Sequence, residues 1–322
     1  MIKHIGIVGS GKMGAGIFNY LSEFEYHITW YILFDDEKDK LKKSFQKKIG
    51  RQLKNEIINK IDFNRKSQYI FTTEIQDLAS CDLIIESITE DKSEKQNLFK
   101  TLEGIVNSEC LFVSNSSSIF SSDLQNKITV FGMHFFYPVA FKDTVELIIS
   151  DNSDGEVSSE LKDFLQTIKK KTFVQTRENP FLLNRFLLNI QAKALELKNK
   201  YVISYNQLDM VSKELIPDFG LFEMMDHVGH KTMYNSIRNY SLLEKKPQKY
   251  SDLLFALKQK IETNSDFNSD DDSTELSDTI LSEIRENLVS EINTTLKYFS
   301  SEFSINEQKL YNYVNDFCGL SI

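Results

Sequence analysis

The sequence predicts an α/β protein in which a doubly wound sheet is followed by an all-α C-terminal domain. Over roughly the first 150 residues, short apolar runs alternate with helical patterns, which is typical of βαβ units. The first apolar run leads directly into a glycine-rich turn. From Phe181 onward strand patterns fade while helical periods continue, so we expect the second part of the chain to be helical.

Apolar runs predict the strands of the first part, and helical periods lie between them. The predicted strands are Ile5–Val8, Thr29–Phe34, Leu83–Glu86, Leu111–Ser114, Val130–Met133, Val145–Ile149 and Lys171–Thr176. The predicted helices are Met13–Phe24, Asp39–Ile61, Ser93–Val106 and Ser158–Lys170. Glu178-Asn179-Pro180 interrupts the pattern, because proline disfavours regular structure at itself and at the residue before it. We therefore expect a first domain over residues 1–178.

In the second part of the chain, helical periods predict helices over Phe181–Lys200, Gln207–Ile216, Leu221–Asn239, Ser251–Glu262 and Glu307–Phe317. Residues 179–262 are expected to form a helical domain, and residues 263–278, with Asp270-Asp271-Asp272, a solvated acidic linker. Arg185-x-x-Leu188 with Ser204-Tyr205-Asn206 recurs 100 residues later as Arg285-x-x-Leu288 with Ser304-Ile305-Asn306. This recurrence predicts a second, repeat-like helical unit over residues 279–322, with coincidence as the alternative.

The N-terminus carries the pattern of a dinucleotide site. His4-Ile5-Gly6-Ile7-Val8 runs into Gly9-Ser10-Gly11-Lys12-Met13-Gly14, and Asp35 follows Gly14 by 21 residues. Strand, three glycines, helix and a distant acid stand in the order of a Rossmann-type site. A tight turn without a ligand is the alternative.

Each part of this pattern has a physical role. Gly9 allows the tight turn, Gly11 lets the backbone approach a pyrophosphate, and Gly14 lets the helix pack closely on the strand. The helix that is predicted to begin at Met13, directly after Lys12, turns its free N–H groups toward the phosphates, so Lys12 and Met13 are candidate cofactor-binding residues. Asp35 is placed to accept hydrogen bonds from the ribose hydroxyls and to repel a 2′-phosphate, so we expect NAD rather than NADP.

Composition excludes several classes of protein. The chain has 322 residues and is 41% hydrophobic and 26% charged, which is ordinary for globular domains. Its three cysteines, Cys81, Cys110 and Cys318, lie far apart, so neither a disulfide framework nor a metal site is indicated. No apolar run approaches the roughly 20 residues that span a membrane, and the sequence begins directly with its first strand. We therefore expect a cytoplasmic protein without a leader peptide.

Positive charge is concentrated in one predicted helical segment. Residues 38–66 hold 11 Lys or Arg against three acidic residues, a local charge of +8 in a chain of net charge −9. A solvated helix is the simplest interpretation. Nucleic acid is not expected as a partner, because the rest of the chain is acidic and the run lacks interleaved aromatic residues. A phosphorylated ligand is the third interpretation.

Polar residues follow two of the predicted strands, where ligands bind in doubly wound sheets. Ser114-Asn115-Ser116-Ser117-Ser118 ends one strand, His134 ends the next, and Glu146 follows His134 by 12 residues. A histidine held by a carboxylate beside a nicotinamide site is suited to general acid–base chemistry. The alternatives are a core histidine and an ordinary strand acid.

Several motifs, all in order, resemble those of the L-3-hydroxyacyl-CoA dehydrogenases. They are Gly9-x-Gly11-x-Met13-Gly14-x-Gly16-Ile17, Ile85-Glu86-Ser87-Ile88-x-Glu90-Asp91, Ser114-Asn115-Ser116-Ser117, His134-Phe135-Phe136-x-Pro138-Val139, Val145-Glu146, Asn184-Arg185 and Gly220-x-Phe222-Glu223-x-x-Asp226-x-x-Gly229. The resemblance covers residues 1 to about 235 and extends weakly into the repeat-like unit.

The resemblance implies a reversible, NAD-dependent oxidation of a short-chain L-3-hydroxyacyl-CoA, such as 3-hydroxybutyryl-CoA, in fatty acid metabolism. It implies that His134 is the catalytic base and that Glu146 orients it. Ser117 would hydrogen-bond the substrate oxygen, and Asn184 would position the reacting group, although a turn residue and a helix cap are the alternatives for these two. The resemblance also implies that Glu90, Lys95 and Asn115 line the nicotinamide side, and that the basic hairpin 38–66 contacts coenzyme A.

Departures from the family pattern leave other functions open. Tyr137 stands where the family usually has Asn, Pro180 replaces a Gly, and Lys142-Asp143-Thr144 replaces a more apolar run. The segment between Gly9 and Asp35 is also about three residues longer than usual. The alternatives are a dehydrogenase of a free 3-hydroxy carboxylate, such as carnitine or a sugar acid, and a non-catalytic NAD-binding protein.

The apolar character of Phe181–Lys200 bears on assembly. This predicted helix has apolar residues on nearly all sides and must be covered around most of its circumference. The resemblance implies that residues 179–262 form a substrate and dimerisation domain, so we expect a homodimer. The alternative is that Ser277–Ile322 covers the helix within the same chain.

Overall fold

The computed structural model describes residues 1–149, 155–176, 180–217, 220–242, 247–269 and 275–322. The chain divides into two compact units, Met1–Pro180 and Phe181–Ile322. The division lies two residues beyond the boundary expected at 178, and residues 178 and 179 of the predicted break lie outside the described residues. Within the described ranges, no helix is long and apolar enough to cross a membrane.

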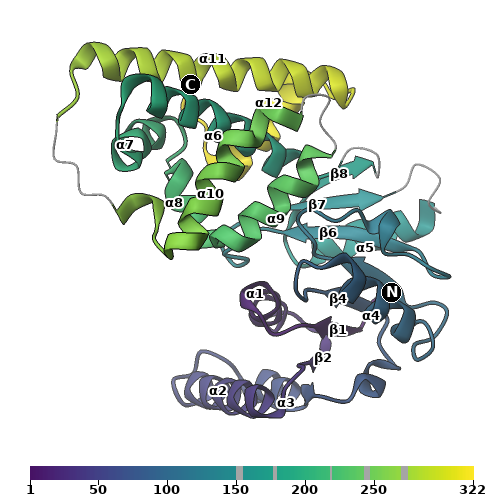
Figure 1. Ribbon diagram of the computed structural model, residues 1–322. Helices are drawn as coiled ribbons and strands as arrows, with labels where there is room; N and C mark the ends of the chain where they lie inside the picture. The colour runs from purple at the N-terminus through teal and green to yellow at the C-terminus, as the bar shows by residue number, and fades with distance from the viewer. Residues whose placement is uncertain (150–154, 177–179, 218–219, 243–246, 270–274) are drawn as a thin grey trace. The chain divides into compact units, whose positions relative to one another are not determined.

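The first unit is built on one eight-stranded sheet in the order β3-β2-β1-β4-β5-β6-β7-β8 (Figure 1). The strands are β1 (His4–Val8), β2 (His27–Tyr31), β3 (Ile70–Thr72), β4 (Leu83–Glu86), β5 (Leu111–Ser114), β6 (Val130–Phe135), β7 (Thr144–Ile149) and β8 (Lys171–Thr176). The doubly wound sheet is confirmed, with strand order reversing at β1. The sequence missed β3, because three residues are too few to show a period.

One pair of strands departs from the parallel pattern. β6 and β7 are antiparallel, whereas every other neighbouring pair is parallel. The residues between them, 136–143, are too few for a crossover helix, so the chain turns back as a hairpin. β6 also runs two residues further than the predicted Val130–Met133, and this places His134 inside the strand.

Helices flank the sheet in the first unit. They are α1 (Lys12–Leu21), α2 (Asp35–Lys54), α3 (Lys60–Ser67), α4 (Lys92–Leu102) and α5 (Gly155–Thr167), with short 3-10 turns η1 (Ile75–Leu78) and η2 (Ser121–Asp123). The single helix predicted over Asp39–Ile61 is wrong, whereas the hairpin over residues 38–66 that the resemblance implied is present: α2 and α3 lie side by side (Figure 1). Glu56 has a left-handed φ of 58°, and the Asn59 side chain accepts a hydrogen bond from the N–H of Asp62, so the chain ends one helix and caps the next.

An aromatic cluster attaches this basic hairpin to the sheet. The rings of Phe18 and Trp30 stack at 4.3 Å, and Phe45 of α2 meets Phe18 edge-on at 5.0 Å. Phe45 and Ile49 are the residues that α2 buries, so most of its cationic side chains are left toward solvent.

The second unit is helical. Its elements are α6 (Leu182–Tyr201), α7 (Tyr205–Leu215), α8 (Leu221–Val228), α9 (His230–Ser241), η3 (Pro247–Tyr250), α10 (Ser251–Thr263), η4 (Phe267–Ser269), α11 (Asp278–Glu302) and α12 (Glu307–Cys318). The single helix predicted over Leu221–Asn239 is wrong, because Gly229 has a φ of 97° and separates α8 from α9. Both α6–α7 and α11–α12 are helix–turn–helix pairs, as the repeat predicted.

The long helix α11 lies along α6 (Figure 1). It buries a stripe of side chains at helical spacing, namely Ile284, Leu288, Ile292, Leu296 and Phe299. Twelve of the 20 residues of α6 are buried within the single chain, including polar Arg185, Asn189 and Gln191. The α11–α12 segment therefore supplies part of the cover that α6 requires.

The predicted linker is partly structured. Within 263–278, residues 270–274 lie outside the described residues, but Phe267 is fully buried and touches the rings of Phe222 and His230. The expectation of a solvated loop is wrong at this point, because Phe267 anchors η4 in the helical core.

Candidate active site

The glycine-rich turn between β1 and α1 has the shape that a dinucleotide requires. Gly9 has a φ of +107°, and a Cβ on it would lie 2.3 Å from the Ser87 carbonyl oxygen. A Cβ on Gly14 would lie 2.2 Å from the carbonyl oxygen of Gly9, so α1 packs directly on the turn. At Gly11, the N-cap of α1, a Cβ would meet nothing within 4 Å. The residues present therefore fit a pyrophosphate over the open N-terminus of α1.

Lys12 and Met13 form the first turn of α1, and Asp35 begins α2. β2 ends at Tyr31 rather than at the predicted Phe34, so Asp35 stands beyond the strand. Its carboxylate accepts hydrogen bonds from Lys38 Nζ at 2.5 Å and Thr73 Oγ1 at 3.0 Å. These two hydrogen bonds hold the pKa of the Asp35 carboxyl below its usual range, so the side chain is ionised at neutral pH.

Glu90 accepts several hydrogen bonds from the serine-rich segment that follows β5. One carboxylate oxygen accepts hydrogen bonds from Ser116 Oγ at 2.6 Å, from Ser118 Oγ at 2.8 Å and from the N–H groups of Ser117 and Ser118. Burial alone would raise the pKa of Glu90, but Lys95 and the serine donors outweigh it and lower that pKa. A charged Glu90 thus fixes the loop that presents Ser117.

Lys95 and Asn115 are both buried beside this loop. Lys95 Nζ lies 2.5 Å from Glu86 Oε1 and 3.5 Å from Glu90 Oε2. Asn115 Oδ1 accepts the N–H of Phe135 at 2.8 Å and so joins the end of β5 to β6. Glu86 belongs to one of the family motifs but was assigned no role from the sequence, although an acid at the end of an apolar strand was a visible signal.

His134 and Glu146 face each other across the antiparallel pair β6–β7. They are register partners, and His134 Nδ1 lies 2.8 Å from Glu146 Oε2. The Glu146 side chain is fully buried and His134 is 5% exposed. An ionised carboxylate can only accept a hydrogen bond, so Nδ1 carries the proton and Nε2 is the basic ring nitrogen.

Gln175 of β8 also binds this pair, because its Nε2 donates to Glu146 Oε1 at 2.6 Å. Each carboxylate oxygen of Glu146 therefore has a directed partner, and the orientation of the carboxylate is fixed. Gln175 was missed, since it belongs to no motif and its neighbour is known only once β7 and β8 are paired.

Asn184 lies in the second unit, in the first turn of α6. Its Nδ2 donates to Tyr240 Oη at 3.0 Å, which ties α6 to α9. The N-cap of α6 is Phe181, not Asn184, so the alternative role of Asn184 as a helix cap is wrong.

Comparison with known proteins matches both units. Residues 4–179 match the family model of the 3-hydroxyacyl-CoA dehydrogenase NAD-binding domain, and residues 181–264 match that of the C-terminal domain. The chain belongs to the 3-hydroxyacyl-CoA dehydrogenase family. It is thus a member of a family of NAD-dependent oxidoreductases, and its cofactor is NAD.

Individual relatives agree with this assignment. The chain is 30% identical over 249 residues to the mitochondrial hydroxyacyl-coenzyme A dehydrogenase of Rattus norvegicus, covering 72% of this chain and 78% of that one. It is 26% identical over 241 residues to the 3-hydroxybutyryl-CoA dehydrogenase of Bradyrhizobium diazoefficiens, covering 72% and 81%. The structure of Escherichia coli K12 3-hydroxybutyryl-CoA dehydrogenase matches with a TM-score of 0.70 at 18% identity, over 87% of this chain and 63% of that chain, and shows the shared fold.

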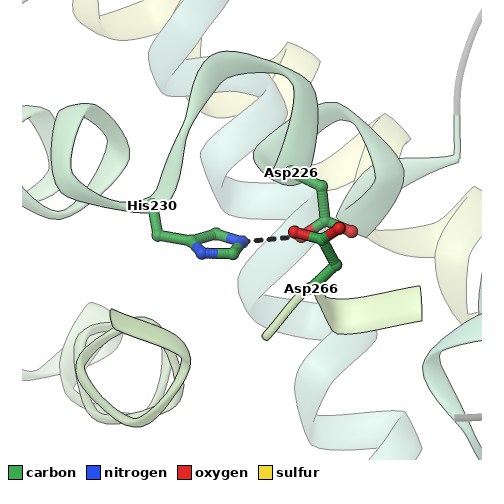
Figure 2. Close-up of side chains that lie close together, drawn as sticks. All are labelled: Asp226, His230 and Asp266. Atoms are coloured by element: carbon green, nitrogen blue, oxygen red, sulfur yellow. Dashed lines mark hydrogen bonds and ion pairs between the residues drawn. The ribbon is translucent and has the colours of Figure 1, made fainter. Parts of the chain in front are cut away.

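A second polar cluster in this dehydrogenase lies in the helical unit. Figure 2 shows His230 Nε2 directed at the Asp226 carboxylate, 2.7 Å away, with Asp266 beside it. Ligand atoms of the three residues lie within 4.8 Å of one another, as a divalent cation would require. However, the Asp226 carboxylate already accepts the N–H groups of Phe267 and Asn268. We therefore interpret the cluster as the cap that holds η4 against α8.

Proposed function

We propose that this protein oxidises the 3-hydroxyl group of a short-chain L-3-hydroxyacyl-CoA, such as 3-hydroxybutyryl-CoA, reversibly to the 3-oxoacyl-CoA. The observation that carries the proposal is the 2.8 Å contact between His134 Nδ1 and Glu146 Oε2, in the same unit as the dinucleotide turn. Relatives named hydroxyacyl-coenzyme A and 3-hydroxybutyryl-CoA dehydrogenase support the substrate class.

The proposed chemistry follows from the tautomer of His134. Because Glu146 holds the proton on Nδ1, Nε2 takes the proton of the substrate hydroxyl. NAD, when bound, would supply the acceptor for the C3–H electron pair, which leaves as hydride while the O–H bond breaks. The products are a ketone, NADH and a protonated His134, whose charge is stabilised by the buried carboxylate of Glu146.

Other residues are proposed to position the substrate and cofactor. Ser117, in the loop fixed by Glu90, would donate to the substrate oxygen. Asn184 of the second unit would position the reacting group. Glu90, Lys95 and Asn115, which the structure connects through β5 and its serine loop, would line the nicotinamide side. Asp35 would hold the adenosine ribose.

The α2–α3 hairpin supports a coenzyme A thioester over a free acid. Residues 38–66 carry a charge of +8, and only Phe45, Ile49 and Lys66 of the two helices are buried. We propose that the remaining cations would meet the phosphates of coenzyme A.

Initial rates of NADH formation with 3-hydroxybutyryl-CoA and with free 3-hydroxybutyrate test the proposal. We expect turnover of the thioester and a loss of about 10²–10⁴-fold in kcat for His134→Asn. His27→Asn, at an exposed histidine of β2, is the matched control and should leave kcat unchanged. Turnover of the free acid alone would favour a 3-hydroxy carboxylate dehydrogenase, and tight NADH binding without turnover of either would favour a non-catalytic NAD-binding protein.

The assembly state is a separate prediction. The family resemblance led us to expect a homodimer through residues 179–262, whereas the cover of α6 by α11 within one chain favours the alternative. The homodimer is the prediction from the resemblance, the monomer with α6 covered by α11 is the prediction from the structure, and a cytoplasmic location stays a prediction.

A further inference from the structure

Lys170 is a buried cation at the corner between α5 and β8. Lys170 is 5% exposed, and its Nζ donates to two backbone carbonyl oxygens, those of Val139 at 2.5 Å and Lys142 at 2.7 Å. Nζ also lies 3.9 Å from the centre of the Tyr20 ring, over its face. The ammonium thus has three neighbours that favour positive charge, two carbonyl dipoles and an aromatic face.

The two carbonyl groups belong to the turn that joins the catalytic strands. Residues 136–143 link β6, which carries His134, to β7, which carries Glu146. Within this turn, the N–H groups of Phe141 and Lys142 both donate to the Pro138 carbonyl, and the N–H of Lys171 donates to Asp143. By donating to the carbonyl oxygens of Val139 and Lys142, Lys170 connects the middle of the turn to its end.

The same turn reaches the nucleotide-binding helix α1. The Val139 side chain lies against Gly16, where an added Cβ would be 3.1 Å from Val139 Cγ2. Lys12 Nζ, in the first turn of α1, lies 4.3 Å from the centre of the Tyr137 ring. Tyr20 of α1 completes the connection, because its hydroxyl donates to the Ile168 carbonyl while its ring covers Lys170.

We propose that Lys170 is a positioning residue: its ammonium holds the β6–β7 turn against α1, so that NAD affinity and the placement of His134 both depend on it. The ammonium binds the turn at Val139 and Lys142, and it acts on α1 and His134 through Val139, Tyr137 and the strand ends. The charged group that acts on Lys170 is Asp143, at the end of the same turn. The kinetic part of this inference rests on the proposed function, whereas the binding part rests only on NAD as cofactor.

The test compares Lys170→Met with Lys162→Met, which makes the same change at an exposed lysine of α5. Titration of each full-length protein with NADH, followed by nicotinamide fluorescence, gives the affinity without any substrate. We expect a rise of about tenfold in the NADH Kd and a fall of about tenfold in kcat for Lys170→Met, and no change for Lys162→Met. Lys170→Arg, which keeps the charge and the donors, should recover part of both losses.

A double-mutant cycle separates positioning from a general loss of structure. If Lys170 acts through the turn, the effects of Lys170→Met and Tyr137→Ala on NADH affinity overlap, so the double variant loses less than the product of the two single losses. Lys170→Gln, which retains two donors without the charge, serves the same cycle if the Met variant does not fold. A folded Lys170→Met or Lys170→Gln protein that binds NADH as the wild type does overturns the proposal. If wild type binds NADH but does not turn over 3-hydroxybutyryl-CoA, the proposed function fails while this binding test still stands.

Discussion

Arg185 of α6 and Glu302 of α11 form an ion pair between the two helix–turn–helix segments of the second unit. Arg185 Nη2 lies 3.7 Å from Glu302 Oε1, and the arginine side chain is 1% exposed. The rings of Phe299 and Phe303 also lie within 5.4 Å of its guanidinium carbon. Thus α11 supplies both the charge and the aromatic faces that a buried cation on α6 requires.

The repeat provides a matched test of this burial. Arg285 stands 100 residues after Arg185, but its side chain is 56% exposed and its pair with Glu214 at 3.6 Å lies at the surface. We expect Arg185→Ala to lower the free energy of unfolding of the helical unit by about 3 kcal/mol, and Arg285→Ala to change it by less than about 1 kcal/mol. Urea unfolding followed by far-UV circular dichroism measures both. Equal effects of the two substitutions would contradict the role given to α11.

Removal of α11 and α12 tests the assembly. A chain that ends at Thr263, near the end of the matched C-terminal domain, lacks η4 with Phe267 as well as α11 and α12, and it uncovers the part of α6 that α11 contacts. We expect full-length protein to sediment as a monomer and the shortened chain to form dimers or aggregates, because exposed apolar helix surface seeks another cover. A full-length homodimer would instead confirm the expectation drawn from the family.

Elements with long, strong periods were predictable from the sequence. The predicted Phe181–Lys200 differs from α6 by one residue at each end. The errors come from local backbone signals that periodicity does not contain: Glu56 and Gly229, both with positive φ, divide helices that were predicted as single. Phe267 was misassigned for another reason. One apolar residue in an acidic segment has no period, and its place in the core depends on tertiary contacts with Phe222, His230 and Asp226.

The candidate site was likewise predicted only in part from the sequence. The His134–Glu146 pair was expected, because His134 ends a predicted strand and the resemblance implied that Glu146 orients it. Gln175 and Lys170 were not found, because the partner of Gln175 depends on how β8 pairs with β7 and the partners of Lys170 lie in the β6–β7 turn. Sequence patterns indicate which side chains carry chemistry, while the residues that orient them are fixed by strand register.

Two glycines of the turn between β1 and α1, Gly11 and Gly14, should respond differently to substitution by alanine. Gly11→Ala adds a Cβ in open space, so the protein should fold with wild-type stability but bind NADH at least about tenfold more weakly, because the methyl group stands where the pyrophosphate approaches. Gly14→Ala adds a Cβ 2.2 Å from the Gly9 carbonyl oxygen and should lower both stability and affinity. Gly50→Ala, in α2 with no atom within 4 Å, is the control. Wild-type NADH affinity in Gly11→Ala would contradict the assigned binding mode.

Cofactor selection by Asp35 gives the next prediction. The carboxylate is ionised and faces Lys38 and Thr73, so it repels a 2′-phosphate. Asp35→Ser combined with Asp36→Arg should shift preference toward NADP(H) by removing the repulsion and adding a phosphate partner. Asp39→Ser, one turn further along α2, is the control. The ratio of Kd values for NADPH and NADH measures the shift, and a wild type that binds both equally well would show that Asp35 does not select.

The last prediction is the pH dependence that Lys170 gives to stability. Burial lowers the pKa of Lys170 to about 8, although Asp143 raises it slightly, whereas an unfolded lysine titrates near 10.4. Between these values the unfolded chain holds a proton that the folded chain has released, so the lysine's contribution to stability increases as pH rises through this window. Below about pH 8 both states are protonated and the contribution is constant.

Trp30, the single tryptophan, is buried in the first unit and reports its unfolding by fluorescence. We expect the difference in unfolding free energy between wild type and Lys170→Met to be flat from pH 6.5 to about 8 and then to change in favour of wild type up to about pH 10. The same comparison with Lys162→Met, at an exposed position of α5, should be flat throughout. A flat difference for Lys170→Met as well would mean that its ammonium is not buried in solution, and the tie to the β6–β7 turn would fail with it.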